Sequence, residues 1–119
     1  MRNFRDLDIW KEARKQTKDI YLLMKLMPED EKFELTSQIK RCSVSIPSNI
    51  AEGSSRKSNK DFSRFLEISL GSCYEVETQL VLCSDLEYLS EKKVEVQIEQ
   101  IQILERRISA FMNYLSKNL

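Results

Sequence analysis

The sequence predicts an all-α protein, an antiparallel up-down-up-down four-helix bundle made by a single domain over residues 1–119. Only two residues are Gly, far below the roughly 7% that is usual, which leaves few residues for the tight turns of a β-sandwich or barrel. Four segments of about 20–28 residues carry apolar side chains three and four positions apart, the spacing of a helix with one buried face. Short connections between such helices make consecutive helices antiparallel neighbours.

Proline residues mark the first two helices. The first helix is expected over residues 7–27, because Pro28 disfavours a helical conformation in the residue before it. The second is expected over residues 29–53, and its first three residues are acidic, which suits the positive end of a helix dipole. Pro47 lies inside this second helix and crowds the carbonyl group of Ser43, so we expect a kink there rather than a break.

The third and fourth helices are expected over residues 59–85 and 90–117. Ser58 and Asp61 match S-x-x-D, a variant of the capping box found at helix N-termini. Apolar side chains on the inner faces of the four helices should form the core. The expected core residues are Trp10, Ile20, Leu35, Ile39, Ile46, Phe62, Leu66, Val76, Leu80, Ile101, Ile108 and Leu115.

The chain has more apolar side chains than one core stripe per helix can use. The additional ones, beside or opposite the expected stripes, are Ile9, Leu22, Leu23, Leu26, Val44, Phe65, Leu70, Val81, Leu82, Val96 and Ile103. Single exposed apolar residues are ordinary, but this many on four thin helices would leave large uncovered patches. They indicate either a subunit interface, and therefore a homo-oligomer, or a core wider than one stripe.

The composition argues against catalysis and against a metal or cofactor site. The chain has no His, the residue that most often serves as general base, metal ligand or partner of a nucleophile. Cys42, Cys73 and Cys83 are odd in number and lack C-x-x-C spacing, so we expect buried reduced thiols and neither disulfides nor a zinc site. We therefore expect a protein that is not an enzyme.

No run of apolar residues approaches the roughly 20 that cross a bilayer. Residues 1–10 are charged and lack the apolar centre of a signal peptide. We therefore expect a cytoplasmic protein that does not associate with membranes.

The segment Ser43–Arg56 is the densest unusual stretch and admits two interpretations. In the structural one, Asn49 bonds a backbone carbonyl that Pro47 leaves free, or fixes the helix register as a lone polar core residue. Glu52 then pairs with Arg56 one helical turn later. In the functional one, the same side chains form a polar pocket near one end of the bundle.

Three motifs give the chain a resemblance to a known family. Phe4–Trp10 reads F-R-D-L-D-I-W, Ser45–Gly53 reads S-I-P-S-N-I-A-E-G, and a G-S-x-x-E motif follows about twenty residues on. Over nearly its whole length the chain resembles the bacterial four-helix-bundle proteins related to S23, the protein encoded in intervening sequences of 23S ribosomal RNA genes. The motif residues singled out here are Pro47, Asn49, Glu52, Gly53, Gly71, Ser72 and Glu75.

The resemblance implies four-helix subunits that assemble into a homopentamer. A related accessory protein of diversity-generating retroelements is similarly a pentamer, and it binds nucleic acid and a partner reverse transcriptase. For this chain the resemblance therefore implies self-association, with nucleic acid or a protein as further partners.

Charge is distributed unevenly along the chain. Residues 1–66 hold 14 basic and 10 acidic side chains, whereas residues 67–119 hold 5 basic and 9 acidic ones. A ring of subunits would multiply a basic cluster, and contacts with phosphates gain from counterion release. The basic residues that would form the cluster are Lys40, Arg41, Arg56, Lys57, Lys60 and Arg64.

Two hypotheses for function follow. In the first, an oligomeric ring binds RNA or DNA through the basic cluster. In the alternative, the protein is an adaptor or scaffold that binds another protein, and the charges are only solvated. The overall neutrality of the chain, with 19 basic and 19 acidic residues, favours the alternative, because nucleic-acid-binding domains are usually strongly basic.

Overall fold

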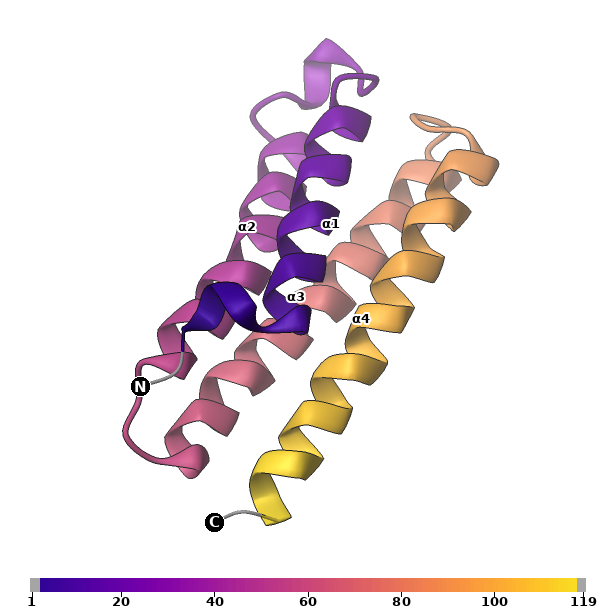
Figure 1. Ribbon diagram of the computed structural model, residues 1–119. Helices are drawn as coiled ribbons and strands as arrows, with labels where there is room; N and C mark the ends of the chain where they lie inside the picture. The colour runs from indigo at the N-terminus through magenta and orange to yellow at the C-terminus, as the bar shows by residue number, and fades with distance from the viewer. Residues whose placement is uncertain (1–2, 118–119) are drawn as a thin grey trace.

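Four long helices make up the computed structural model, which describes residues 3–117 (Figure 1). They are α1 (Asp8–Met24), α2 (Leu35–Ser54), α3 (Asn59–Asp85) and α4 (Glu91–Lys117), with short 3-10 helices at Phe4–Asp6 and Glu29–Glu31. The described residues contain no strand, so the predicted all-α four-helix bundle is confirmed. None of these helices combines the length and the apolar character needed to cross a bilayer.

The helices form an elongated bundle that measures 46 × 22 × 20 Å. Each helix packs against the next one in the chain, and α1 also packs against α4, which closes the bundle. The diagonal pairs, α1 with α3 and α2 with α4, make no close backbone contact among the described residues. Figure 1 accordingly shows α1 between α2 and α4. The outer faces of α1 and α3 therefore point to opposite sides of the molecule.

The second helix begins later than predicted. Glu29–Glu31 form a separate 3-10 helix, and α2 starts at Leu35. The carboxylate of Glu31 accepts a hydrogen bond from the backbone N–H of Leu35 at 3.1 Å and another from the hydroxyl of Tyr88 at 3.2 Å. The acidic segment thus stabilises the positive end of the helix from outside, because its carboxylate satisfies one of the free N–H groups there.

The other boundaries differ less from the prediction. α1 ends at Met24 because residues 25–27 continue only as single hydrogen-bonded turns. α3 begins at the capping box, where the hydroxyl of Ser58 accepts from the backbone N–H of Asp61 at 3.1 Å. At the start of α4 the hydroxyl of Ser90 accepts from the N–H of Lys93 at 3.3 Å.

The core consists mainly of the predicted residues. Ten of the twelve are buried, and the two exceptions, Trp10 and Leu35, are half-buried and pack against the edge of the core. Ile9 and Leu23, expected outside the core stripes, are buried as well. The core is therefore slightly wider on α1 than one stripe, because α1 packs against two neighbouring helices.

α2 runs through Pro47 without a break. Because proline has no N–H, the carbonyl oxygen of Ser43 lacks its usual partner one turn later. The hydroxyl of Thr17 on α1 lies 2.9 Å from that oxygen and 3.0 Å from the carbonyl oxygen of Ala13, so its single proton is within reach of both acceptors. Asn49 does not make this contact, since its amide donates to the carbonyl of Ser45 at 2.9 Å instead. A side chain of the neighbouring helix α1 thus offers the Ser43 carbonyl a donor in place of the N–H that Pro47 lacks.

Gly53 lies within α2 and allows α3 to approach closely. A Cβ atom at Gly53 would lie 2.7 Å from the Cβ of Phe65 and 2.8 Å from the Cδ1 of Phe62, well inside normal contact distance. The helix continues to Ser54, one residue beyond the predicted end. Glycine is needed here because there is no room for a side chain, and not because of an unusual backbone conformation.

We expect Gly53→Ala to lower the free energy of unfolding by about 1–3 kcal/mol, because the added methyl group must displace two phenylalanine side chains. Urea denaturation followed by circular dichroism measures the change. Ser48→Ala, at an exposed position of the same helix, is the control; it should change stability by less than about 0.5 kcal/mol. Equal losses in both variants would contradict the close-packing explanation.

Candidate interaction surfaces

The seam between α2 and α3 is lined by small and polar side chains that bond to one another. The hydroxyls of Ser45 and Ser72 are 3.0 Å apart, and the amide of Asn49 donates to the Ser45 hydroxyl at 2.9 Å. The hydroxyl of Ser69 donates to the carbonyl oxygen of Ile46 at 2.9 Å. Ser45 and Asn49 of the S-I-P-S-N-I-A-E-G segment thus have their partners within the bundle, which supports the structural interpretation of the segment over a polar pocket.

The two motif glutamates make contacts within the chain. Glu52 pairs with Arg56 at 3.2 Å, as predicted, and both side chains are exposed, so the pair adds little stability. Glu75 accepts a hydrogen bond from the thiol of Cys42 at 3.2 Å. The amide of Gln79 donates to the same sulfur atom at 3.6 Å. These contacts tie the outer edge of α3 to α2.

The six basic residues predicted to form a cluster lie in two separate places. Lys40 and Arg41 belong to the first half of α2, whereas the other four, at positions 56–64, surround the connection to α3. Roughly 20 Å of helix separates the two groups at about 1.5 Å per residue. The structure therefore corrects the expectation of one cluster and leaves a basic group of four at one end of the bundle.

Part of that end group is already neutralised. Arg64 lies 3.6 Å from the carboxylate of Asp61, and Arg56 has the pairing with Glu52 described above. Lys57 and Lys60 are exposed and form no ion pair with any residue between 3 and 117. These two lysines are the members of the end group that remain available to a phosphate.

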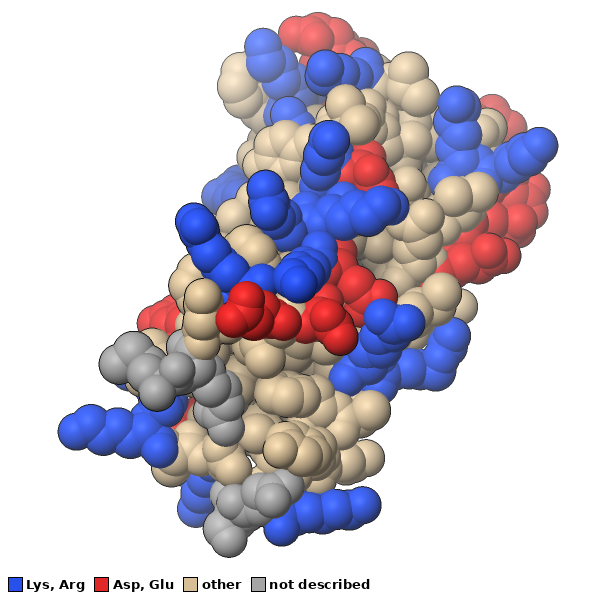
Figure 2. All heavy atoms as spheres, in the orientation of Figure 1, with Lys and Arg blue, Asp and Glu red and all other residues tan. Residues whose placement is uncertain are grey.

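A longer basic surface, missed in the sequence interpretation, follows the outer face of α1. Lys11, Lys18 and Lys25 repeat every seven residues and Arg14 lies between the first two; we call these four the α1 surface. All four are exposed and none forms an ion pair within the described chain. Lys and Arg side chains gather over the middle of the face seen in Figure 2, where α1 faces the viewer. The seven-residue spacing was the signal that could have revealed it.

Aromatic rings extend this basic surface toward α2. The guanidinium of Arg14 lies 5.6 Å from the centre of the Trp10 ring, which meets Phe4 edge-on with ring centres 5.1 Å apart. The ammonium of Lys40 on α2 lies 5.1 Å from the centre of the Tyr21 ring. These cation–π contacts hold the cations in place without neutralising them.

From Glu67 to Asp85, the outer face of α3 carries the opposite charge. Residues 67–85 include four Glu or Asp and no Lys or Arg. Glu67, Glu75 and Asp85, here called the α3 surface, are exposed and form no ion pair with another described residue. The bundle therefore has a basic and an acidic side, which the diagonal placement of α1 and α3 keeps apart.

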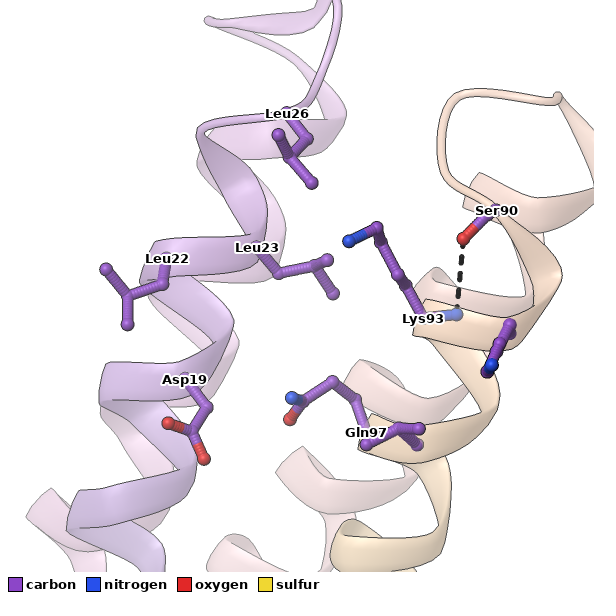
Figure 3. Close-up of a pocket in the computed structure, with 9 residues that line it drawn as sticks. Asp19, Leu22, Leu23, Leu26, Ser90, Lys93 and Gln97 are labelled. Atoms are coloured by element: carbon purple, nitrogen blue, oxygen red, sulfur yellow. Dashed lines mark hydrogen bonds between the residues drawn. The ribbon is translucent and has the colours of Figure 1, made fainter.

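An open groove of about 610 Å³ separates α1 from α4 near the end of the bundle where α1 stops. Figure 3 shows Leu23 of α1 and Leu26, just beyond its end, facing Lys93 and Gln97 of α4 across the groove. Leu22 and Leu26 are 50% and 56% exposed. Farther along the seam the amide of Gln16 donates to the side-chain oxygen of Gln97 at 2.7 Å. The lining of the groove itself is mainly apolar, and two lysines, Lys92 and Lys93, lie at its rim against one acid, Asp19.

Two carboxyl groups meet between α3 and α4. Glu105 is only 9% exposed; its burial, and then a hydrogen bond with Glu77 and the charge of Glu77, raise the pKa of Glu105 to about 8. The amide of Gln102 donates to Glu77 at 3.3 Å. Oε2 of Glu105 has no hydrogen-bond partner among the described residues. Burial beside Glu77 thus favours the protonated form of Glu105 at neutral pH.

The three thiols are free and poorly ionised. Burial raises the pKa of Cys73 to about 12 and that of Cys83 to about 11, and burial together with the Glu75 contact raises the pKa of Cys42. The thiolate, which is the nucleophilic form, is therefore scarce at neutral pH. Among residues 3–117 no three Cys, Asp or Glu side chains lie close enough together to hold a metal ion.

Comparison with known proteins places the chain in a family. Residues 5–110 match the family model described as 23S rRNA-intervening sequence protein. The chain belongs to this family. The resemblance drawn from the three sequence motifs is thereby confirmed, and members of the 23S rRNA-intervening sequence protein family can be compared with it directly.

One such comparison is with a solved structure. The chain is similar to a protein of unknown function from the S23 ribosomal protein family of Bacteroides thetaiotaomicron, with a TM-score of 0.81 and 25% sequence identity. The similarity covers 87% of this chain and 97% of that chain. A search of curated proteins gave no match. The four-helix bundle is thus shared with another S23-family protein across almost its whole length.

Proposed function

We propose that this 23S rRNA-intervening sequence protein is a non-enzymatic module that works as a homo-oligomer, specifically a homopentamer. The observation that carries the proposal is the set of large apolar side chains that stay exposed on the single chain. Seven of the eleven apolar residues expected outside the core are exposed, among them Leu22, Leu26, Val96 and Ile103 along the seam of α1 and α4. So many exposed apolar side chains on a small protein indicate a protein–protein interface.

The proposed number of five subunits follows from the family resemblance, and the absence of an enzymatic role follows from the residues. The raised pKa values of the three cysteines leave no activated thiol at neutral pH, and the chain has no His that would act as general base. We also propose a cytoplasmic location, where buried free thiols remain reduced.

Sedimentation velocity at micromolar protein concentration tests the assembly. We expect one main species of about 70 kDa, five times the 14.1 kDa chain. Dynamic light scattering of the same samples provides an independent size. A single 14.1 kDa species at the highest soluble concentration would refute the homo-oligomer, and a stable multimer of another size would refute only the number five.

We propose nucleic-acid binding by the end group as a second function, because Lys57 and Lys60 are exposed and free of ion pairs within the described chain. They also flank the start of α3, where free backbone N–H groups favour a phosphate. A pentamer would present five copies of the group at one end. The alternative is an adaptor that binds only protein.

Fluorescence anisotropy with labelled RNA and DNA at increasing salt separates these functions. If the end group binds phosphates, affinity should fall steeply with salt and should decrease for the double variant Lys57→Glu/Lys60→Glu. Lys32→Glu, an exposed lysine beyond the other end of the bundle, is the matched control and should bind like the wild type. No binding at low salt would remove nucleic acid as a partner and leave the protein-binding adaptor.

A further inference from the structure

The α1 surface and the α3 surface are complementary in charge but cannot meet within one chain. The four cations of the α1 surface have no acidic partner among the described residues, and two of the three acids of α1 are already paired; the third, Asp8, is the first residue of the helix. Glu12 pairs with Arg107 of α4, and Asp19 pairs with Lys15. The acids of the α3 surface are likewise unpaired and lie on the opposite side of the bundle. Each side therefore has an excess of one sign of charge that only another molecule can balance.

Both surfaces also carry exposed apolar side chains among the charges. On α1, Tyr21 and Leu22 are 40% and 50% exposed; on α3, Ile68 and Leu82 are 51% and 43% exposed. Charged borders around an apolar centre are typical of protein–protein interfaces. A surface that binds only phosphate would not need the apolar residues, which favours a protein partner for both sides.

Gly71 is a separate sign that something approaches α3 from outside. It is exposed in the middle of a 27-residue helix, where glycine costs about 1 kcal/mol relative to alanine. Apart from its chain neighbours and the backbone of its own helix, no atom of the described chain lies within 4 Å of its Cβ position, so internal packing does not explain this glycine, unlike Gly53. A missing side chain at this position lets a neighbouring helix come close to the backbone of α3.

We propose that copies of this chain associate front to back, with the α1 surface of one copy against the α3 surface around Gly71 of the next. The inference rests on the proposed self-association and assigns two charged surfaces to it, in addition to the exposed apolar residues at the seam of α1 and α4. Two different patches on opposite sides of a subunit make a heterologous contact, which repeats from copy to copy and closes into a ring when the rotation fits. A two-fold dimer would instead place each surface against its own copy, where like charges repel.

Charge reversal on one side at a time tests this assignment. One variant carries Lys11→Glu, Lys18→Glu and Lys25→Glu, and the other carries Glu67→Lys, Glu75→Lys and Asp85→Lys. Each should lose the multimer in sedimentation velocity and run as a 14.1 kDa monomer, because both of its sides then have the same sign of charge. A third variant with all six changes should recover the multimer, since its two sides are complementary again.

Two further variants guard against misfolding and nonspecific effects. Lys32→Glu/Lys57→Glu/Lys60→Glu reverses three charges outside both surfaces and should remain multimeric. Gly71→Leu adds bulk without charge and raises helix propensity, so it should retain its helical circular dichroism spectrum yet lose the multimer. Salt should also weaken the wild-type multimer, because exposed charges are screened.

The outcomes distinguish this inference from the proposed function. A wild-type monomer would refute self-association itself. A wild-type multimer that survives both three-residue reversals and Gly71→Leu would leave self-association intact and overturn the assignment of surfaces. Loss of the multimer in both reversals without recovery in the six-residue variant would equally overturn the pairing of α1 with α3.

Discussion

Phe62→Ala should lower the free energy of unfolding by about 3–5 kcal/mol, the usual cost of removing a large aromatic side chain from a core. Phe62 is fully buried and meets Phe111 of α4 edge-on, with ring centres 5.5 Å apart. Its ring also fills the space against Gly53 that leaves no room for a side chain. One residue thus joins α2, α3 and α4 near the connection between α2 and α3.

Urea denaturation measures this loss of unfolding free energy. The slope of the transition should be equal in both proteins, because a shift of the midpoint then reports a change in stability alone. Phe33→Ala is the matched control, because Phe33 is 83% exposed and its removal should change stability by less than about 0.5 kcal/mol. A loss below about 1 kcal/mol for Phe62→Ala would show that this end of the bundle is loosely packed, since core truncations cost more.

Glu105→Gln should make the stability of the protein less dependent on pH and higher at pH 8. The pKa of Glu105 is raised from an ordinary 4.5 to about 8 in the folded chain. Between these two values the folded state holds a proton that the unfolded state has released, so wild-type stability falls as pH rises from about 5 to about 8 and then levels off. Glutamine resembles the protonated acid and loses no proton over this range.

We expect a stabilisation by Glu105→Gln on the order of 1–3 kcal/mol at pH 8, because the variant removes a buried charge next to Glu77. Thermal and urea unfolding at several pH values between 5 and 9 measure it. Glu99→Gln, at an exposed position on the same helix, should keep the wild-type pH profile. Identical profiles for wild type and Glu105→Gln would mean that Glu105 is ionised in the folded protein.

The fold was predictable because its signal is local. Apolar spacing, the capping box at Ser58 and the scarcity of glycine all act within one helix or one connection. The start of α2 was missed because it depends on a side-chain contact, the cap that Glu31 provides to Leu35. The partner of the Ser43 carbonyl was missed because Thr17 lies 26 residues away on another helix.

The interaction surfaces were predicted less well. Grouping Lys40 with Lys60 by sequence position ignored the length of α2 that separates them. The repeat of Lys11, Lys18 and Lys25 was visible in the sequence, but counting charge by halves of the chain concealed it. The contact between Glu77 of α3 and Glu105 of α4 depends on how the two helices are aligned along their length. The spacing of apolar residues within each helix does not determine that alignment.

Trp10 gives the molecule an intrinsic optical probe. It is the only tryptophan in the chain, and its indole lies half-buried under the guanidinium of Arg14, beside the seam of α1 and α2. Tryptophan emission therefore comes from one place only, the border of the basic α1 surface. Its wavelength and quenching report on that side alone, so docking there can be followed without attaching a dye.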